Sequence, residues 1–410
     1  MSISLAKLEL LFTKLAAFGK NNEGGLTRIS YSSEFLAAQT MLSEFMTNIG
    51  MKVDIDAIGN LIGTYPGRDN SLPPVCCGSH LDSVPNGGMF DGALGIVTAL
   101  ECIRSWHEEN WQPLRPVKVI AFVEEEGTLF GSGCLGSRAM TGELQCIELT
   151  DFKTSDGHTL PELLTNCNLD FASFNEASAL KKSASFIELH IEQGATLDES
   201  GHSVGIVSAI VGIKRLTITI CGKANHAGST AMHRRQDALV AASSLISQIY
   251  EDALASGGSY VATVGKLDVF PNAENVIPGK VQMTIEIRSA DMATVEAVKE
   301  KIMRKYTQVS TQYKVTIETI AENNLAPMPM DEELIKVIAA ASEGLGIEYQ
   351  ILPSWAGHDA MIIGRHMPTA MIFVPSINGI SHSPLELSEW PAIEKATQVL
   401  DGALKILASK

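Results

Sequence analysis

The chain has 410 residues and a formal charge of −16, from 31 Lys and Arg against 47 Asp and Glu. This balance excludes duplex nucleic acid and an anionic membrane as expected partners, because both bind through an excess of cationic side chains, whereas a small anionic substrate needs only one local arginine. Apolar residues make up 45% of the chain and charged residues 19%, which predicts a globular protein with a large core.

Two further features bear on the compartment. The seven cysteines include no CxxC pair, which predicts free thiols in a reducing environment. The first apolar residues are interrupted by Lys7, Glu9 and Lys14, a pattern that predicts an amphipathic helix and not a signal peptide. No window approaches the roughly 18 uncharged apolar residues of a membrane span. We therefore expect a cytoplasmic protein.

After this helix, the sequence predicts several short elements around one long polar loop. They are a helix at about 33–48, strands at 53–55, 61–64 and 75–77, and a helix at 93–103. The loop contains His80, Asp82 and Asp91 among glycine, serine and proline residues, and it follows the carboxyl end of a strand, where open α/β sheets place ligand sites. His80 could bind a metal, with Asp82 fixing its tautomer and Asp91 as a separate ligand. Alternatively, all three could be solvated loop residues.

Three later apolar strands, predicted at 117–123, 186–191 and 369–374, also end in candidate ligands. These are Glu125 and Glu126 after the first strand, His190 near the end of the second, and His382 after a glycine turn that follows the third. Taken singly, the acids could form a solvated loop and His190 could be an ordinary strand residue. Four such strand ends on one sheet edge predict a shared site, which suits a pair of zinc-like or manganese-like ions with a neighbouring carboxylate as general base.

The pattern changes between residues 213 and 322. Strands are predicted there at 216–221, 260–270, 281–288 and 314–319, and helices at 237–254 and 292–312. This βαββαβ order is that of a ferredoxin-like unit. We therefore predict an α/β fold in which residues 1–212 and 323–410 form a discontinuous catalytic domain and residues 213–322 an inserted one. After the insertion, helices are predicted at 331–344 and from a cap at Ser388 to about 407.

Seven segments carry a family resemblance. They are Gly78-Ser-His-Leu-Asp82, Asn86-Gly-Gly-Met-Phe-Asp-Gly92, Glu125-Glu-Gly127, Gly136-Ser-Arg-Ala-Met140, Glu188-Leu-His-Ile-Glu-Gln-Gly194, Asn225-His-Ala-Gly228 and Gly379-Ile-Ser-His-Ser-Pro384. Jointly they resemble the hydantoinase/carbamoylase family of amidohydrolases, within the di-zinc carboxypeptidase and aminoacylase superfamily. That family comprises N-carbamoyl-L-amino acid hydrolases, allantoate amidohydrolases, ureidoglycolate amidohydrolases and β-ureidopropionases of one type. The resemblance spans nearly the whole chain.

The resemblance implies a di-metal exopeptidase-like catalytic domain with an inserted ferredoxin-like dimerisation or lid domain. It implies two divalent ions per subunit (Zn, Mn or Co), with His80 and His190 on one ion, Glu126 and His382 on the other, and Asp91 bridging them. By the same resemblance, Glu125 is the general base and Asp82 orients His80.

The family also implies substrate contacts in the inserted domain. His226 is expected to stabilise the developing oxyanion, and Asn275 and Arg288 are expected to bind the substrate carboxylate. The guanidinium fork of Arg288 suits a carboxylate, although without the resemblance a surface salt bridge would be its expected role. Gln193 and His358 are further expected contacts. The resemblance implies a homodimer in which His226 reaches the metal site of the partner subunit.

Two positions depart from the family pattern. Glu124 replaces the Asp often found before the Glu pair, and Trp355 stands where relatives often have a small residue beside Gly357. Trp355 could reshape the pocket for the substrate's side group, so this departure bears on which substrate is used.

The predicted activity is hydrolysis of the carbamoyl C–N bond of a ureido acid to an amine, carbon dioxide and ammonia. Residues 136–140 resemble the carbamoyl-amino-acid branch and residues 375–382 the allantoate branch. We expect N-carbamoyl-L-amino acids as substrates, with allantoate as the alternative. A dipeptidase or aminoacylase is disfavoured by His190 and Arg288. A catalytically inactive binding relative is disfavoured by the presence of Glu125 and of all five metal ligands.

Overall fold

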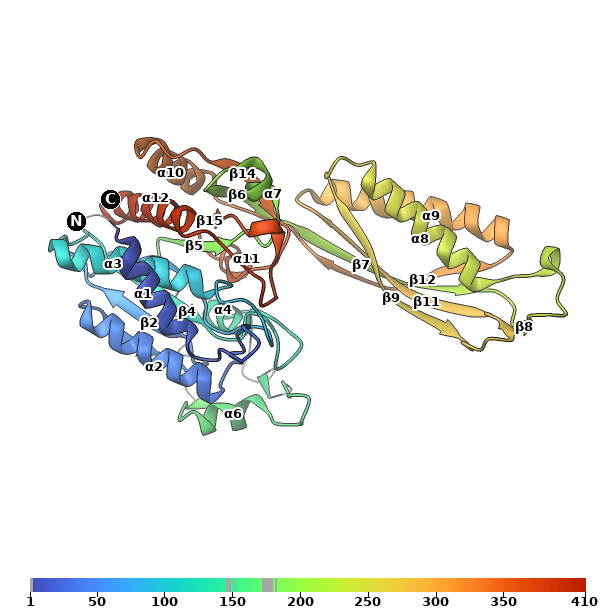
Figure 1. The fold of residues 1–410 in the computed structure, drawn as a ribbon, viewed down its shortest axis with the longest axis horizontal. Coiled ribbons are helices and arrows are strands. Elements are labelled where there is room, and N and C mark those ends of the chain that lie inside the picture. Colours follow the sequence, from blue (N-terminus) through green and yellow to red (C-terminus); the bar gives the residue numbers. More distant parts are fainter. Residues whose placement is uncertain (1–2, 145–148, 151, 172–179, 181–182) are drawn as a thin grey trace. The chain divides into compact units, whose positions relative to one another are not determined.

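The computed structural model describes residues 3–144, 149–150, 152–171, 180 and 183–410. The chain divides into two compact units, unit 1 (Met1–Ser208 with Pro329–Lys410) and unit 2 (Ala209–Met328) (Figure 1). The segment predicted as inserted, 213–322, lies within unit 2. Both of its predicted boundaries fall inside strands, because β7 (Gly212–Cys221) begins before residue 213 and β12 (Thr316–Leu325) continues beyond residue 322.

Unit 1 is built on one mixed sheet. Its described strands are β1 (Lys52–Ile55), β2 (Leu61–Tyr65), β3 (Val75–His80), β4 (Val117–Phe122), β5 (Ser185–Ile191), β6 (Gly205–Ile210), β13 (Met328–Pro329), β14 (Gln350–Ser354) and β15 (Thr369–Val374). They follow the order β1-β2-β4-β3-β5-β15-β6-β13, with β14 paired to β6. Strands β4, β3, β5 and β15 run parallel to their neighbours in this series, so their carboxyl ends meet at one edge. Every residue of β3, β5 and β15 is buried, as expected of parallel strands covered on both faces.

Helices pack on this sheet in layers. The described helices of unit 1 are α1 (Leu5–Ala16), α2 (Ser33–Asn48), α3 (Ala93–Glu109), α4 (Leu135–Thr141), α6 (Leu160–Asn166), α7 (Thr196–Ser200), α10 (Glu332–Gly344), α11 (Asp359–Ile363) and α12 (Trp390–Ala408). α3 packs on β3, β4 and β5 and is itself contacted by α1 and α12, which explains why every residue from Ala93 to Trp106 is buried. α11 contacts α4, β5 and β15. No helix in the described part of the chain is long and apolar enough to cross a membrane.

Unit 2 is a sheet and two helices with a core of its own. Its antiparallel sheet has the order β12-β7-β11-β9, with β9 at Val261–Phe270 and β11 at Lys280–Ser289. Helices α8 (Ala238–Leu254) and α9 (Met292–Tyr313) pack on this sheet, and buried residues alternate along β7 and β11, as expected when one face is covered. The chain order is the predicted βαββαβ. The short strands β8 (Asn225–His226) and β10 (Val276–Ile277) form a separate pair.

Some local predictions were wrong or incomplete. Ser388 does not cap the last helix: its hydroxyl donates to the Pro375 carbonyl (2.8 Å), and α12 begins at Trp390 after Glu389. Strands β6 and β14 were not predicted. β14 pairs with β6 and contains Pro353. A proline within a short run argues against a strand in sequence-based prediction, which explains why β14 was missed.

Candidate metal centre and active site

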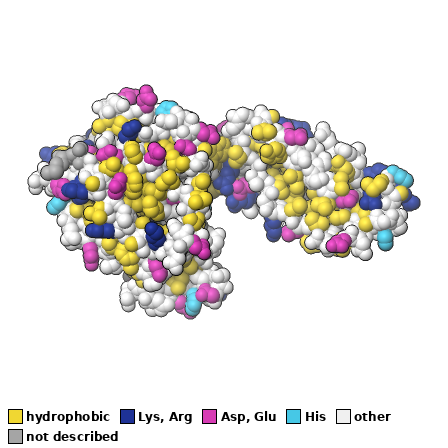
Figure 2. Space-filling view, in the orientation of Figure 1, with side chains coloured by type: hydrophobic (Ala, Val, Ile, Leu, Met, Phe, Trp, Pro, Cys, Tyr) yellow, Lys and Arg dark blue, Asp and Glu magenta, His cyan; other side chains and the backbone are white. Residues whose placement is uncertain are grey.

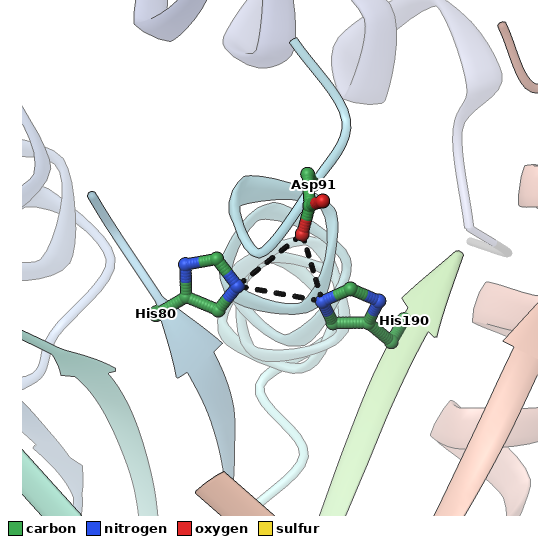
Figure 3. Close-up of side chains that lie close together, drawn as sticks. All are labelled: His80, Asp91 and His190. Carbon is green, nitrogen blue, oxygen red and sulfur yellow. Dashed lines mark hydrogen bonds and ion pairs between the residues drawn. The ribbon is translucent and has the colours of Figure 1, made fainter. Parts of the chain in front are cut away.

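Two histidines and one aspartate converge at the carboxyl edge of the parallel strands (Figure 3). His80 is the last residue of β3, His190 lies near the end of β5, and Asp91 lies in the loop before α3. The Oδ1 atom of Asp91 is 3.3 Å from Nε2 of His80 and 3.2 Å from Nε2 of His190. The two Nε2 atoms are 3.5 Å apart. All three side chains are buried.

The tautomers of both histidines follow from their partners. Nδ1 of His80 lies 3.0 Å from the carbonyl oxygen of Asp82, and Nδ1 of His190 lies 2.9 Å from that of Ile191. Because a carbonyl oxygen only accepts, each Nδ1 carries the proton and each Nε2 presents a lone pair. The N–H of Gly92, which donates to Nε2 of His190 (3.3 Å), agrees with this assignment. Three acceptor atoms therefore face one another.

The other oxygen of Asp91 takes part in a second group. Oδ2 of Asp91 is 3.3 Å from Nε2 of His382, and that nitrogen is 3.4 Å from Oε2 of Glu126. One carboxylate thus presents one oxygen to each of two ligand groups, which is the arrangement of a bridging ligand. All five residues predicted as metal ligands are brought together here.

The chemistry of these donors fits divalent cations. Imidazole nitrogens and carboxylate oxygens are the ligands of zinc and of similar ions in proteins. Two of the oxygens, Oδ1 of Asp91 and Oε1 of Glu126, are buried and accept no hydrogen bond from any residue that the structure describes. Burying such atoms is costly unless a cation or a proton compensates them.

The pKa shifts of Asp91, Glu126 and His382 also indicate that the two carboxylates are stabilised by positive charge, from protons or from a cation. Burial alone would raise the pKa of Asp91, but when His190, His382 and His80 are doubly protonated their Nε2–H groups donate to this carboxylate and hold its pKa well below its ordinary value. Burial, aided by the charge of Asp91, raises the pKa of Glu126 to about 7. The hydrogen bond with Asp91 raises the pKa of His382 to about 9. Protons and a cation therefore compete for these ligands.

Glu125, the predicted base, lies beside this centre. Its Oε2 is 3.8 Å from Nε2 of His80, and its Oε1 accepts a hydrogen bond from the thiol of Cys134 (3.5 Å). Burial raises the pKa of Glu125 well above its ordinary value. A carboxylate held near the metal ligands with a raised pKa is suited to accept a proton.

Asp82 orients its neighbours differently from the expectation. Its carboxylate is 3.8 Å from Nδ1 of His80, and the ring bonds instead to the Asp82 carbonyl. The two carboxylate oxygens accept the N–H groups of Glu125 and Glu126, at 3.2 Å each. Asp82 therefore fixes His80 with its backbone and the two glutamates with its side chain.

Two residues predicted to contact substrate have other contacts in the structure. Gln193 donates its side-chain N–H to Oδ2 of Asp91 (2.9 Å). His358 is 1% exposed, packs edge-on against the His190 ring and has its Nε2 2.9 Å from the hydroxyl of Ser354. A buried ring with this partner supports His190, and the predicted contact of His358 with substrate stays a prediction.

Glu386 and Glu188 were missed by the sequence analysis. Oε1 of Glu386 accepts the N–H groups of Phe90 (2.9 Å) and Asp91 (3.1 Å), and burial raises the pKa of Glu386 to about 7. Glu188 accepts hydrogen bonds from Ser79 and Ala360 beneath the site. Glu386 lies four residues after His382 in the same loop, and this spacing was the only sequence feature that could have indicated it.

The loops of the site adopt backbone conformations that few residues tolerate. Gly92 has φ +62°, and a Cβ there would lie 2.4 Å from the His80 ring, so only glycine fits. Gln193 and His382 also have positive φ, at +60° and +53°. Non-glycine residues in this region often mark functional sites, where the surrounding structure holds the strain.

The remaining predicted residues lie in unit 2. His226 is exposed, and its Nδ1 accepts the N–H groups of Gly228 (3.0 Å) and Ser229 (3.2 Å), so its proton is on Nε2 and that nitrogen is a donor. The carbonyl of Asn275 accepts the N–H of Ala227 (2.9 Å), which places Asn275 beside this turn. Figure 2 shows cationic and histidine side chains gathered at this end of unit 2, in a chain that is strongly acidic as a whole.

Arg288 lies at the other end of the same sheet. It pairs with Ile213 at the start of β7, whereas Lys280, eight residues earlier in β11, pairs with Cys221 on the side of β8. Eight residues of antiparallel strand span about 27 Å. Within unit 2, Arg288 is therefore far from His226 and Asn275. Its Nε donates to Glu286 (2.7 Å).

Comparison with known proteins gives consistent results. Residues 76–406 match the peptidase family M20/M25/M40. The chain is 36% identical over 405 residues to an N-carbamoyl-L-amino-acid amidohydrolase of Paenarthrobacter aurescens, with 98% of this chain and 97% of that protein covered. It is also 36% identical over 374 residues to an allantoate amidohydrolase of Escherichia coli (strain K12), with 91% and 90% covered.

The solved structures agree with the sequence comparisons. A hydantoinase/carbamoylase family amidase from Burkholderia multivorans has a TM-score of 0.90 at 29% identity, with 100% of this chain and 99% of that chain covered. The predicted family resemblance is confirmed, and the His, Asp and Glu groups at the sheet edge fit the metal dependence of the family. The chain therefore belongs to peptidase family M20/M25/M40 and is a metal-dependent hydrolase of the amidohydrolase type.

Proposed function

We propose that the chain hydrolyses the carbamoyl C–N bond of N-carbamoyl-L-amino acids, with two divalent cations, zinc, manganese or cobalt, in unit 1. The observation that carries this proposal is the Asp91 carboxylate, whose two oxygens face two separate ligand groups beside the partly buried carboxylate of Glu125. Further support comes from the relatives of that name, which are as long as this chain. The net reaction consumes the ureido acid and one water and releases the amino acid, carbon dioxide and ammonia.

The chain's own residues have distinct roles in this reaction. The two ligand groups around Asp91 would hold the cations. Such cations, when bound, polarise a carbonyl group and lower the pKa of water. Glu125 takes the proton of the attacking water and passes it to the departing nitrogen. Asp82 keeps His80 in the tautomer that presents Nε2 and keeps the Glu125 backbone in place.

The substrate carboxylate would bind Arg288, whose guanidinium offers paired donors, with Asn275 as a further contact. His226 would donate its Nε2–H to the oxyanion of the tetrahedral intermediate. We propose a homodimer, because the roughly 27 Å between the Arg288 and His226 ends of one sheet is too far for one small substrate. One substrate would then take these contacts from two chains.

Allantoate is the second candidate substrate. The Escherichia coli relative named for allantoate is as similar as the carbamoylase, at 36% identity. The segment 375–382, which carries His382, resembles the allantoate branch. Allantoate also offers a carboxylate and a ureido group, so the same residues would act on it.

The test measures both ammonia and free primary amine released by protein reconstituted with Zn²⁺, Mn²⁺ or Co²⁺, because the ureido substrates release ammonia whereas N-acetyl and dipeptide substrates release only an amine. The panel contains several N-carbamoyl-L-amino acids, allantoate, an N-acetyl-L-amino acid and a dipeptide. We expect the highest kcat/KM for a carbamoyl amino acid. A preference for allantoate would select the second candidate, whereas turnover confined to the N-acetyl or dipeptide substrates would contradict both.

A further inference from the structure

Arg28 is a buried cation beneath the metal centre that neither the ligand set nor the substrate contacts explain. Its side chain is 1% exposed, and burial lowers its pKa to about 10, so it stays charged at neutral pH. In the described part of the chain, its guanidinium donates only to backbone carbonyls. These are Leu81 (2.6 Å, from Nε), Leu15 (3.3 Å, from Nη1) and Phe18 (3.2 Å, from Nη1).

The backbone of Arg28 holds the same loop from a second side. Its N–H donates to the hydroxyl of Ser83 (2.8 Å), and its carbonyl accepts the N–H of Ser83 (3.1 Å). Leu81 and Ser83 are the two neighbours of Asp82. Three hydrogen bonds with one residue, two at backbone groups of Leu81 and Ser83 and one at the Ser83 hydroxyl, therefore hold the segment on both sides of Asp82.

Asp82 forms hydrogen bonds with one ligand from each of the two ligand groups and with the base. Its carbonyl sets the tautomer of His80, and its carboxylate holds the N–H groups of Glu125 and Glu126. Arg28 also lies close enough to act electrostatically on the Asp82 carboxylate. A shift of this short segment would move a ligand of each cation and the base together.

We propose that Arg28 is a positioning residue of the metal centre: it anchors the segment 81–83 to the end of α1 and so fixes the geometry of His80, Glu125 and Glu126. The inference rests on the proposed metal site, and it adds a residue that touches neither metal nor substrate. A guanidinium serves here because its fixed, divergent N–H groups reach carbonyls on two different segments, which the ammonium of a lysine cannot do in the same way.

The test compares Arg28→Met and Arg28→Lys with Arg104→Met in the full-length chain. Arg104 is a matched control, because it is also buried and bonded, to Glu101 and Glu108 on α3, without a contact to the ligands. Co²⁺ is titrated into metal-free protein under conditions where circular dichroism shows each variant to be folded. The readouts are the dissociation constants and the visible spectrum of bound Co²⁺, which reports ligand geometry.

We expect Arg28→Met to weaken Co²⁺ binding about 10- to 100-fold, the range found when residues that orient metal ligands are changed. Its Co²⁺ spectrum should also change, Arg28→Lys should lie between Arg28→Met and the wild type, and Arg104→Met should bind as the wild type does. If Arg28→Met does not fold, Ser83→Ala and Arg28→Lys carry the test, and both should weaken binding.

Wild-type affinity and spectrum in the Arg28 variants would overturn the inference, and so would an equal loss in Arg104→Met. Failure of the wild-type chain to bind Co²⁺ would instead overturn the metal centre itself, and this inference with it. The two failures are thus distinguishable.

Discussion

The consecutive acids Glu124, Glu125 and Glu126 lie in three different environments. Glu124 has φ +57°, which turns the chain at the end of β4, and one oxygen of its buried carboxylate accepts the N–H of Leu129 (2.6 Å). Glu126 lies in the second ligand group, and Glu125 lies near His80 without a bond to it. The left-handed conformation of Glu124 at the strand end thus places the three acids differently. Glu124 has a structural role, Glu125 is the proposed base and Glu126 is a proposed metal ligand.

The first prediction concerns Glu125. Glu125→Gln keeps the size of the side chain but cannot accept a proton, so turnover should fall by roughly 10²- to 10⁴-fold while bound metal is unchanged. Metal content by atomic emission and kcat on the best carbamoyl substrate check this. If metal and activity fall together, Glu125 is a ligand.

A second prediction separates ligand histidines from the others. His190→Ala should lower the bound metal, because it removes one of few ligands from the group around Asp91. The same loss is expected of His80→Ala and His382→Ala. His202→Ala is the control, since among the described residues the hydrogen-bond partner of the His202 ring is the Ser200 hydroxyl (3.1 Å) and not a metal ligand. Full metal occupancy in His190→Ala would exclude its role as a ligand.

The ligands could be predicted from the sequence because each follows an apolar strand closely. A buried strand leaves little freedom for the one or two residues at its end, so His80, His190 and Glu126 had to lie at one edge. Glu386 and the ring of His358 could not be placed, because their positions depend on loop paths and on packing between distant segments. The hydrogen bond between His80 and the Asp82 carbonyl could not be predicted either, because every residue has a backbone carbonyl and the residue type does not show whether it accepts a hydrogen bond from a ligand.

At the scale of elements, predictions succeeded where the apolar period was long. The parallel strands and the helices α3, α8 and α9 were predicted, because their burial imposes a continuous or periodic pattern. β12 was predicted to end near residue 319, yet it pairs with β7 up to Leu325. Residues 321–325 are all exposed and three of them are polar, so the strand there depends on backbone hydrogen bonds to β7, which leave no alternating apolar pattern in the sequence.

A third prediction concerns the packing of α9 on β7 and β12. The buried ammonium of Lys214 bonds to Glu296 of α9 and to Glu322 of β12 (2.7 Å). Hydrogen bonds from Lys214 and Lys299 lower the pKa of Glu322 to about 2. Because this pKa is below its ordinary value, the ion pairs stabilise the fold above about pH 4.5, and the stabilisation is lost as the pH falls towards 2.

Lys214→Met should therefore destabilise the chain at pH 7, by about 1 kcal/mol because both acids are partly exposed. The difference from the wild type should shrink as the pH is lowered from 5 to 3. Urea midpoints measured across this range check the prediction. The control is Lys336→Met, which removes an exposed pair with Glu333. A difference independent of pH would show that packing, and not charge, explains the effect of Lys214.

At the scale of the whole molecule, the proposed dimer can be tested by mixing two inactive variants. In a shared site, Glu125→Gln chains paired with His226→Ala chains place both defects in one site and leave the other intact. Random pairing makes half of the dimers mixed, each with one intact site, so about a quarter of the wild-type activity should return. Mass spectrometry of the mixture verifies subunit exchange. Exchange without recovered activity would show that His226 does not act in the partner's site.

The position of β15 in the sheet has a consequence for the synthesis of the chain. β15 lies between β5 and β6, yet it is made only after the whole of residues 209–328. At usual rates of translation, the time between the synthesis of β5 and that of β15 is on the order of 10 s. During that time β5 has an open edge, and an unpaired strand edge can pair with another chain. This edge of β5 stays unpaired until β15 is made, and His382, which follows β15, can complete the ligand groups only after that.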